Sequence, residues 1–135
     1  MRRYWLVALV FVALLRPGIG AAQQTVRPVP PPRLDDLEPA VAEQIRDAQQ
    51  RTAGIVAKGG AARELADAYG SLGRVYHAYE FLDSAEPAYL NARRLASGNS
   101  EWPHLLGVLY QQTGRLDEAA EAFAREYPWS GVLAV

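Results

Sequence analysis

A pattern of residues recurs in this chain after 34 positions, and no other feature limits the possible folds as strongly. Leucine, glycine and tyrosine open both copies, and a leucine, an aspartate, two alanines and an aromatic residue follow in the same register. The first copy is Leu72, Gly73, Tyr76, Leu82, Asp83, Ala85, Ala88 and Tyr89, and the second is Leu106, Gly107, Tyr110, Leu116, Asp117, Ala119, Ala122 and Phe123. Self-similarity at a fixed period of about 20–50 residues indicates a small unit stacked on copies of itself. We therefore expect a solenoid-type scaffold.

Ahead of the repeat, residues 35–60 carry one apolar stripe at helical spacing. The stripe consists of Val41, Ile45, Ala48, Thr52 and Ile55, which recur every three or four residues as on one helix face. We expect this helix to begin near Asp35 and Asp36, to hold Pro39 in its first turn and to end at residues 58–60. Because end units must cover a face that inner units bury, it should act as an amphipathic cap.

Residues 61–127 are predicted to form two helical hairpins. Helices are expected over 61–78, 83–95, 101–113 and 117–126. Gly73 and Gly107 lie in mid-helix, where glycine costs about 1 kcal/mol relative to alanine, so we expect a neighbouring helix to approach closely at both. Pro87 is compatible with the second helix only within its first turn. The predicted fold class is all-α, a helical-hairpin solenoid with an N-terminal amphipathic capping helix.

The two copies together resemble the tetratricopeptide repeat. The resemblance covers about half of the chain, over residues 66–99 and from 100 to the end, and Glu80 departs from it where the pattern favours glycine. It implies a concave groove, lined by the first helix of each hairpin, that holds a peptide or a partner segment. Carried over by position, the groove residues are Asp67, Gly70, Ser71, Arg74, His77, Glu101, His104, Leu105, Val108, Gln111 and Gln112, of which Arg74, His77, His104, Val108 and Gln111 are the candidate partner-binding residues. Chaperone-binding members clamp a terminal carboxylate with lysine and asparagine. Only Arg74 could do so here, which disfavours that subclass.

The first 22 residues have the three parts of a secretory signal peptide: a basic start, an apolar run from Tyr4 to Leu15 and small residues before a polar stretch. We expect cleavage after Ala22, with Ala21 as the second choice and an uncleaved membrane anchor as the alternative. Residues 23–34 are rich in proline and should form an extended, semi-rigid linker. The predicted location is therefore the bacterial periplasm or the outside of the cell.

Composition excludes several kinds of function. The chain has no cysteine, so it can form neither disulfides nor thiolate metal sites. Removal of the signal peptide takes away three of the 14 basic residues and leaves 11 against 15 acidic ones, a net charge near −4. A protein of that charge is a poor candidate for sequence-independent nucleic-acid binding.

No pattern of catalytic, cofactor-binding or metal-binding residues emerges. His77 and His104 are the only histidines, and neither has a second ligand at the i+4 position that metal-binding helices use. The serines lack a recognisable histidine and carboxylate arrangement, and the acidic pairs fall at predicted helix starts, where the helix dipole explains them. We expect a non-enzymatic protein without a cofactor or small-molecule substrate.

The sequence leaves three functional hypotheses open. The first is an exported adaptor that binds a protein or peptide in its repeat groove. The second is the helical accessory region of a larger exported enzyme, truncated here, since residues 128–135 form an apolar tail where a repeat would continue. The third is a signal-anchored assembly factor that self-associates through this tail and the groove.

Overall fold

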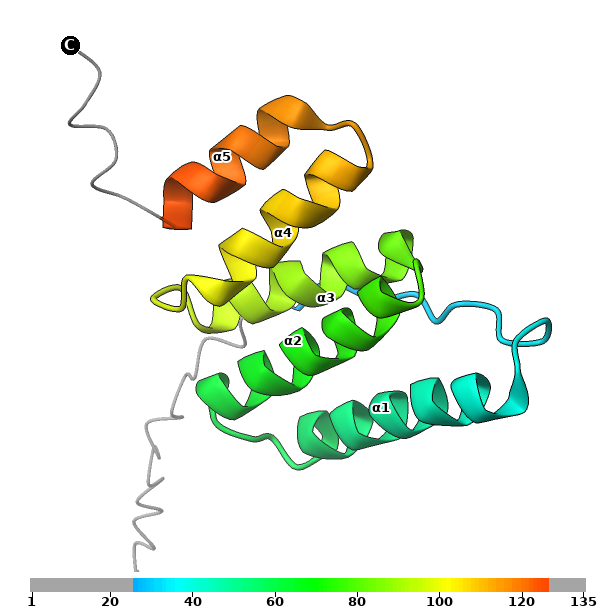
Figure 1. Cartoon of the computed structure of the whole chain (residues 1–135). Helices are drawn as coiled ribbons and strands as arrows, with labels where there is room; N and C mark the ends of the chain where they lie inside the picture. Colours follow the sequence, from blue (N-terminus) through cyan, green and yellow to red (C-terminus); the bar gives the residue numbers. More distant parts are fainter. Residues whose placement is uncertain (1–25, 127–135) are drawn as a thin grey trace, which may run out of the picture.

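The structure is a computed structural model that describes residues 26–126, and all the regular structure in that range is helical. The helices are α1 (Pro39–Ala57), α2 (Ala62–Ala78), α3 (Leu82–Leu95), α4 (Glu101–Gln112) and α5 (Leu116–Glu126). They follow one another in space as they do along the chain, with α1 on α2, α2 on α3, α3 on α4 and α4 on α5 (Figure 1). The predicted all-α class is confirmed. The predicted signal peptide, its cleavage site and the apolar tail at 128–135 lie outside the described residues.

Helix α1 begins later than the sequence suggested. Pro39 is its first residue and Glu38 precedes it without a capping side-chain hydrogen bond. The predicted caps, Asp35 and Asp36, lie in the turn before the helix, because proline at the first helical position already fixes the backbone angle that starts a helix. The other end is as predicted, since Gly59 has a φ of 66° and follows the C-cap residue Lys58.

The buried face of α1 nearly coincides with the predicted stripe. Ile45, Ala48 and Thr52 are buried as expected. Ala42 is buried in place of Val41, which is only partly covered, and Ile55 is also partly covered. This face packs against α2, where the Thr52 hydroxyl donates to the carbonyl oxygens of Ala48 at 2.9 Å and Ala68 at 3.3 Å. One hydroxyl therefore links the two helices.

The turns of the two hairpins have the same hydrogen bonds. Between α2 and α3, the Phe81 N–H donates to the Tyr76 carbonyl at 2.9 Å, and between α4 and α5 the Arg115 N–H donates to the Tyr110 carbonyl at 2.8 Å. These pairs are 34 positions apart. The left-handed residue of each turn is also equivalent: Glu80 has a φ of 62° and Gly114 a φ of 73°. The departure from glycine at position 80 thus leaves the turn geometry unchanged.

Each mid-helix glycine of the repeat faces an aromatic ring of the following helix. A Cβ atom built on Gly73 would lie 2.7 Å from Cδ1 of Tyr89, and one built on Gly107 would lie 2.5 Å from Cε1 of Phe123. A side chain cannot be accommodated at these distances without movement of the ring. The close approach predicted from the two glycines is confirmed, and it fixes how α2 meets α3 and how α4 meets α5.

One apolar core runs through all five helices. Its largest fully buried side chains are Trp102, Tyr76, Tyr89, Ile45, Leu106 and Leu109. Trp102 of α4 packs against Gly70 of α2, where an added Cβ would collide with Cη2 of the indole ring. Small residues on α3, such as Ala85, Ala88 and Ala92, are completely buried and let the neighbouring helices come close.

Pro87 lies deeper in α3 than the sequence prediction required. Because α3 starts at Leu82, Pro87 is in its second turn rather than its first. Its missing N–H therefore removes a backbone hydrogen bond from within the helix. The burial of Ala85, Ala88 and Tyr89 on either side holds the helix together through packing.

Candidate functional site

Helices α2 and α4 share a polar surface that contains most of the predicted groove residues. Arg74 of α2 forms an ion pair with Glu101 of α4, and its other Nη atom donates to the Ser71 hydroxyl at 3.2 Å. The guanidinium carbon also lies 5.5 Å from the centroid of the Trp102 ring. About half of each charged side chain is exposed, so the pair itself adds at most about 1 kcal/mol to stability. The candidate cation for a partner carboxylate therefore already has an internal counterion.

His77 joins three helices at the other end of this surface. Its Nδ1 atom lies 3.2 Å from the Tyr89 hydroxyl and its Nε2 atom 2.8 Å from Oε1 of Gln112. Burial raises the pKa of the Tyr89 hydroxyl well above its ordinary value, while the Arg74 charge lowers it and the Glu101 charge raises it. His77 is thus a structural bridge from α2 to α3 and α4, with one edge left open to solvent.

The remaining candidate residues are all on α4 but do not form a single site with the first two. His104 pairs with Glu126 of α5 at 2.9 Å and packs edge-on against the Phe123 ring. Val108 is partly covered, and Gln111 is exposed. The two histidines have separate partners, and within residues 26–126 no group of three histidine or acidic side chains is placed to hold a metal ion.

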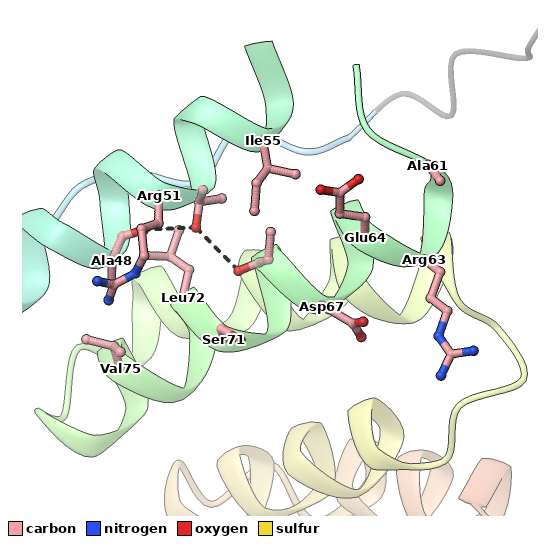
Figure 2. Close-up of a pocket in the computed structure, with 12 residues that line it drawn as sticks. Ala48, Arg51, Ile55, Ala61, Arg63, Glu64, Asp67, Ser71, Leu72 and Val75 are labelled. Carbon is pink, nitrogen blue, oxygen red and sulfur yellow. Dashed lines mark hydrogen bonds between the residues drawn. The ribbon is translucent and has the colours of Figure 1, made fainter. Parts of the chain in front are cut away.

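A groove between α1 and α2 was not predicted from the sequence. It has a volume of about 540 Å³ and an apolar floor with a charged rim (Figure 2). Arg51 on α1 lies at one end, and Arg63, Glu64 and Asp67 on α2 lie toward the other. The lining residues are Ala48, Arg51, Thr52, Ile55, Ala61, Arg63, Glu64, Asp67, Ala68, Ser71, Leu72 and Val75.

Only Asp67 and Ser71 of the predicted groove residues line this cavity. Because α1 was predicted to be a cap, no binding surface was expected on it. The available signal was the size of the side chains at the α1–α2 contact. Ala48 and Ala68 are too small to fill the space between the helices, so a hollow remains beside the buried Thr52.

Comparisons with known proteins give no independent identification. No family model, no curated protein and no solved structure matches the chain. Within the described residues, no helix is long and apolar enough to cross a membrane. Any proposal for its function therefore depends on the sequence and geometry of this chain.

Proposed function

We propose that this protein is a tetratricopeptide-type, non-enzymatic adaptor of the bacterial periplasm or envelope that binds a protein or peptide partner. The observation that supports it best is the equivalence of the two hairpins in three respects: glycine–aromatic contact, turn hydrogen bonds and left-handed turn residue. Repeated helical hairpins form extended surfaces in which each unit contacts mainly its neighbours, a design used for binding. The secretory signal predicted for residues 1–22 supports the location.

The binding surface in this proposal combines the α1–α2 groove with the adjoining face of α2. An apolar side chain of the partner would occupy the floor formed by Leu72, Val75 and Ile55. Polar groups beside it would meet a rim of both signs, with Arg51 at one end and Glu64 and Asp67 toward the other. A rim of mixed charge favours a partner segment that itself carries both charges or polar groups rather than a strongly acidic or basic one.

The test is capture of a partner from envelope extracts by the purified protein and two matched variants. Ser71→Arg places a long charged side chain in the groove at an exposed helical position and removes one exposed hydrogen bond from Arg74, so the helix should be retained. Ala120→Arg makes the same kind of change at an exposed position of α5, away from the groove. We expect the wild type and Ala120→Arg to retain the same protein and Ser71→Arg to lose it. Retention of every captured protein by Ser71→Arg would contradict the proposal.

A further inference from the structure

The proline-rich segment ahead of α1 is not a free linker. It has no regular secondary structure over residues 26–34 and passes behind α3 in the view of Figure 1 before the chain turns into α1. The Arg27 N–H donates to Oδ1 of Asn91 at 2.7 Å, and Nδ2 of Asn91 donates to the Arg27 carbonyl at 2.9 Å. Two residues 64 positions apart are thus joined by a pair of hydrogen bonds.

Asn91 recognises backbone rather than side chain. The asparagine is only 1% exposed, while the Arg27 side chain is exposed and takes no part in the two bonds. A buried amide left without partners would cost about 1–3 kcal/mol. With the segment in place, Asn91 on α3 satisfies both its amide donor and its amide acceptor on the backbone of Arg27.

The surface around Asn91 suits a proline-containing peptide. Val29 packs against the core, and prolines at positions 28 and 30–32 keep the chain extended at little cost in conformational entropy. Beyond the segment, a hollow of about 540 Å³ remains between it and helices α1 and α2. It is bordered by the segment on one side and by Gln49, Thr52, Ala53, Val56, Tyr69, Leu72 and Tyr76 on the other. The segment therefore lies on this surface without filling it.

We propose that Asn91 and the adjoining surface of α1–α3 form a binding site for an extended, proline-containing peptide, which residues 26–33 occupy as an exchangeable internal ligand. A partner that presents the same chemistry would replace the segment: one residue with a free N–H and carbonyl at Asn91, and a β-branched apolar residue two positions on. Thr52 and Leu72 border both this hollow and the α1–α2 groove, but the proposed occupant and the test of this site differ from those of the groove.

The experiment uses a fluorescent peptide with the sequence of residues 26–33 and measures its anisotropy with the full chain. Arg27→Pro removes the N–H that donates to Oδ1 of Asn91 and so weakens the binding of the internal segment. We expect the peptide to bind this variant about tenfold more tightly than it binds the wild type. Arg27→Ala keeps the N–H and should behave as the wild type. Adding Asn91→Leu to Arg27→Pro should abolish binding, because the amide that holds the backbone is gone.

Folding of each variant is followed by far-UV circular dichroism, and Val29→Asp serves as a second way to loosen the segment. A folded Arg27→Pro or Val29→Asp protein that binds the peptide no better than the wild type would overturn the proposal. Loss of the helical signal in both variants would also overturn it, because the segment would then be an inseparable part of the fold. If the wild type is a dimer that the peptide dissociates, the site is occupied by residues 26–33 of a second copy. That result would also overturn the proposal of an internal ligand.

Discussion

At the scale of single residues, replacing a helical glycine with alanine should raise the free energy of unfolding at one position and lower it at two others. Gly54 lies within α1 with nothing within 4 Å of an added Cβ, so Gly54→Ala should raise the free energy of unfolding by about 0.5–1 kcal/mol. Gly73→Ala and Gly107→Ala would press a Cβ into an aromatic ring and should lower it by about 1–3 kcal/mol. Urea unfolding of the three variants measures the difference. A Gly73→Ala protein as stable as the wild type would show that the Tyr89 ring moves aside freely.

The turn residues make a second matched pair. Glu80 holds a left-handed conformation that costs an ordinary residue about 1–2 kcal/mol, whereas Gly114 holds the same conformation without this cost. Glu80→Gly should therefore stabilise the protein by up to about 1 kcal/mol, after the greater flexibility of glycine in the unfolded chain is subtracted. Gly114→Ala should destabilise it by about 1 kcal/mol. Melting temperatures from calorimetry show whether each variant is more or less stable than the wild type. A lower melting temperature for Glu80→Gly would contradict the strain argument.

At the scale of the elements, Arg115 ties the α4–α5 turn to α3. Its guanidinium group bonds Glu86 at 2.7 Å and Glu118 at 2.6 Å, and it stacks 4.4 Å from the centroid of the Tyr110 ring. Arg115→Met should lower the free energy of unfolding at neutral pH by about 1 kcal/mol. Arg125→Met is the control, since within residues 26–126 Arg125 pairs with Glu121 at 3.8 Å on the exposed surface of α5. Chemical denaturation at pH 7 compares the two variants.

The same network should fade in acid. The hydrogen bond from Arg115 holds the pKa of the Glu118 carboxyl below its ordinary value. A carboxyl whose pKa is lower in the folded state contributes stability above its unfolded pKa of about 4.3 and loses that contribution as the pH falls through the folded value. The stability difference between the wild type and Arg115→Met should therefore shrink below about pH 4. A difference that stays constant with pH would point to packing on Tyr110 instead.

The helices themselves were largely predictable, because apolar spacing and breakers were unambiguous. Predicted helices over 61–78 and 83–95 correspond to Ala62–Ala78 and Leu82–Leu95. The errors arose where a local signal competed with another. Asp35 and Asp36 looked like caps, but Pro39 sets the helix start. The docking of residues 26–33 could not be predicted, since Asn91 contacts the backbone of Arg27 and such a contact leaves no pattern in the sequence.

At the scale of the whole molecule, the sequence predicted the order of the elements better than the surfaces they form. Arg74 and His77 do lie on a surface shared by α2 and α4, but internal bonds to Glu101 and Gln112 occupy their polar groups. The α1–α2 groove arises from side-chain volumes at a contact between two helices, which requires their relative placement to be known. A polar residue on a helix face is therefore a weaker indicator of a binding site than the space left between helices.

Alkaline unfolding tests whether the helices form one cooperative core. Burial raises the pKa of the hydroxyl groups of four tyrosines: Tyr69, Tyr76, Tyr89 and Tyr110. At Tyr76 the hydrogen bond from Gln49 lowers the pKa in part, and at Tyr110 the nearby Glu86 raises it further. These tyrosines come from α2, α3 and α4, and all four belong to the same core. Each contributes stability that is complete below the unfolded pKa of about 10 and is lost as the pH rises through the folded value.

Between those two pKa values the unfolded chain has lost a proton that the folded chain retains. Each such tyrosine should then lower the free energy of unfolding by about 1.4 kcal/mol per pH unit. We expect the tyrosinate absorbance of these four rings, taken as the difference from a variant with phenylalanine at all four positions, to change together with helical circular dichroism above pH 10, because buried rings ionise when the core opens. Tyr89→Phe should reduce the slope of stability against pH by the contribution of one group. A Tyr89→Phe protein whose stability falls as steeply as that of the wild type would show that Tyr89 ionises within the folded state and would contradict the burial argument.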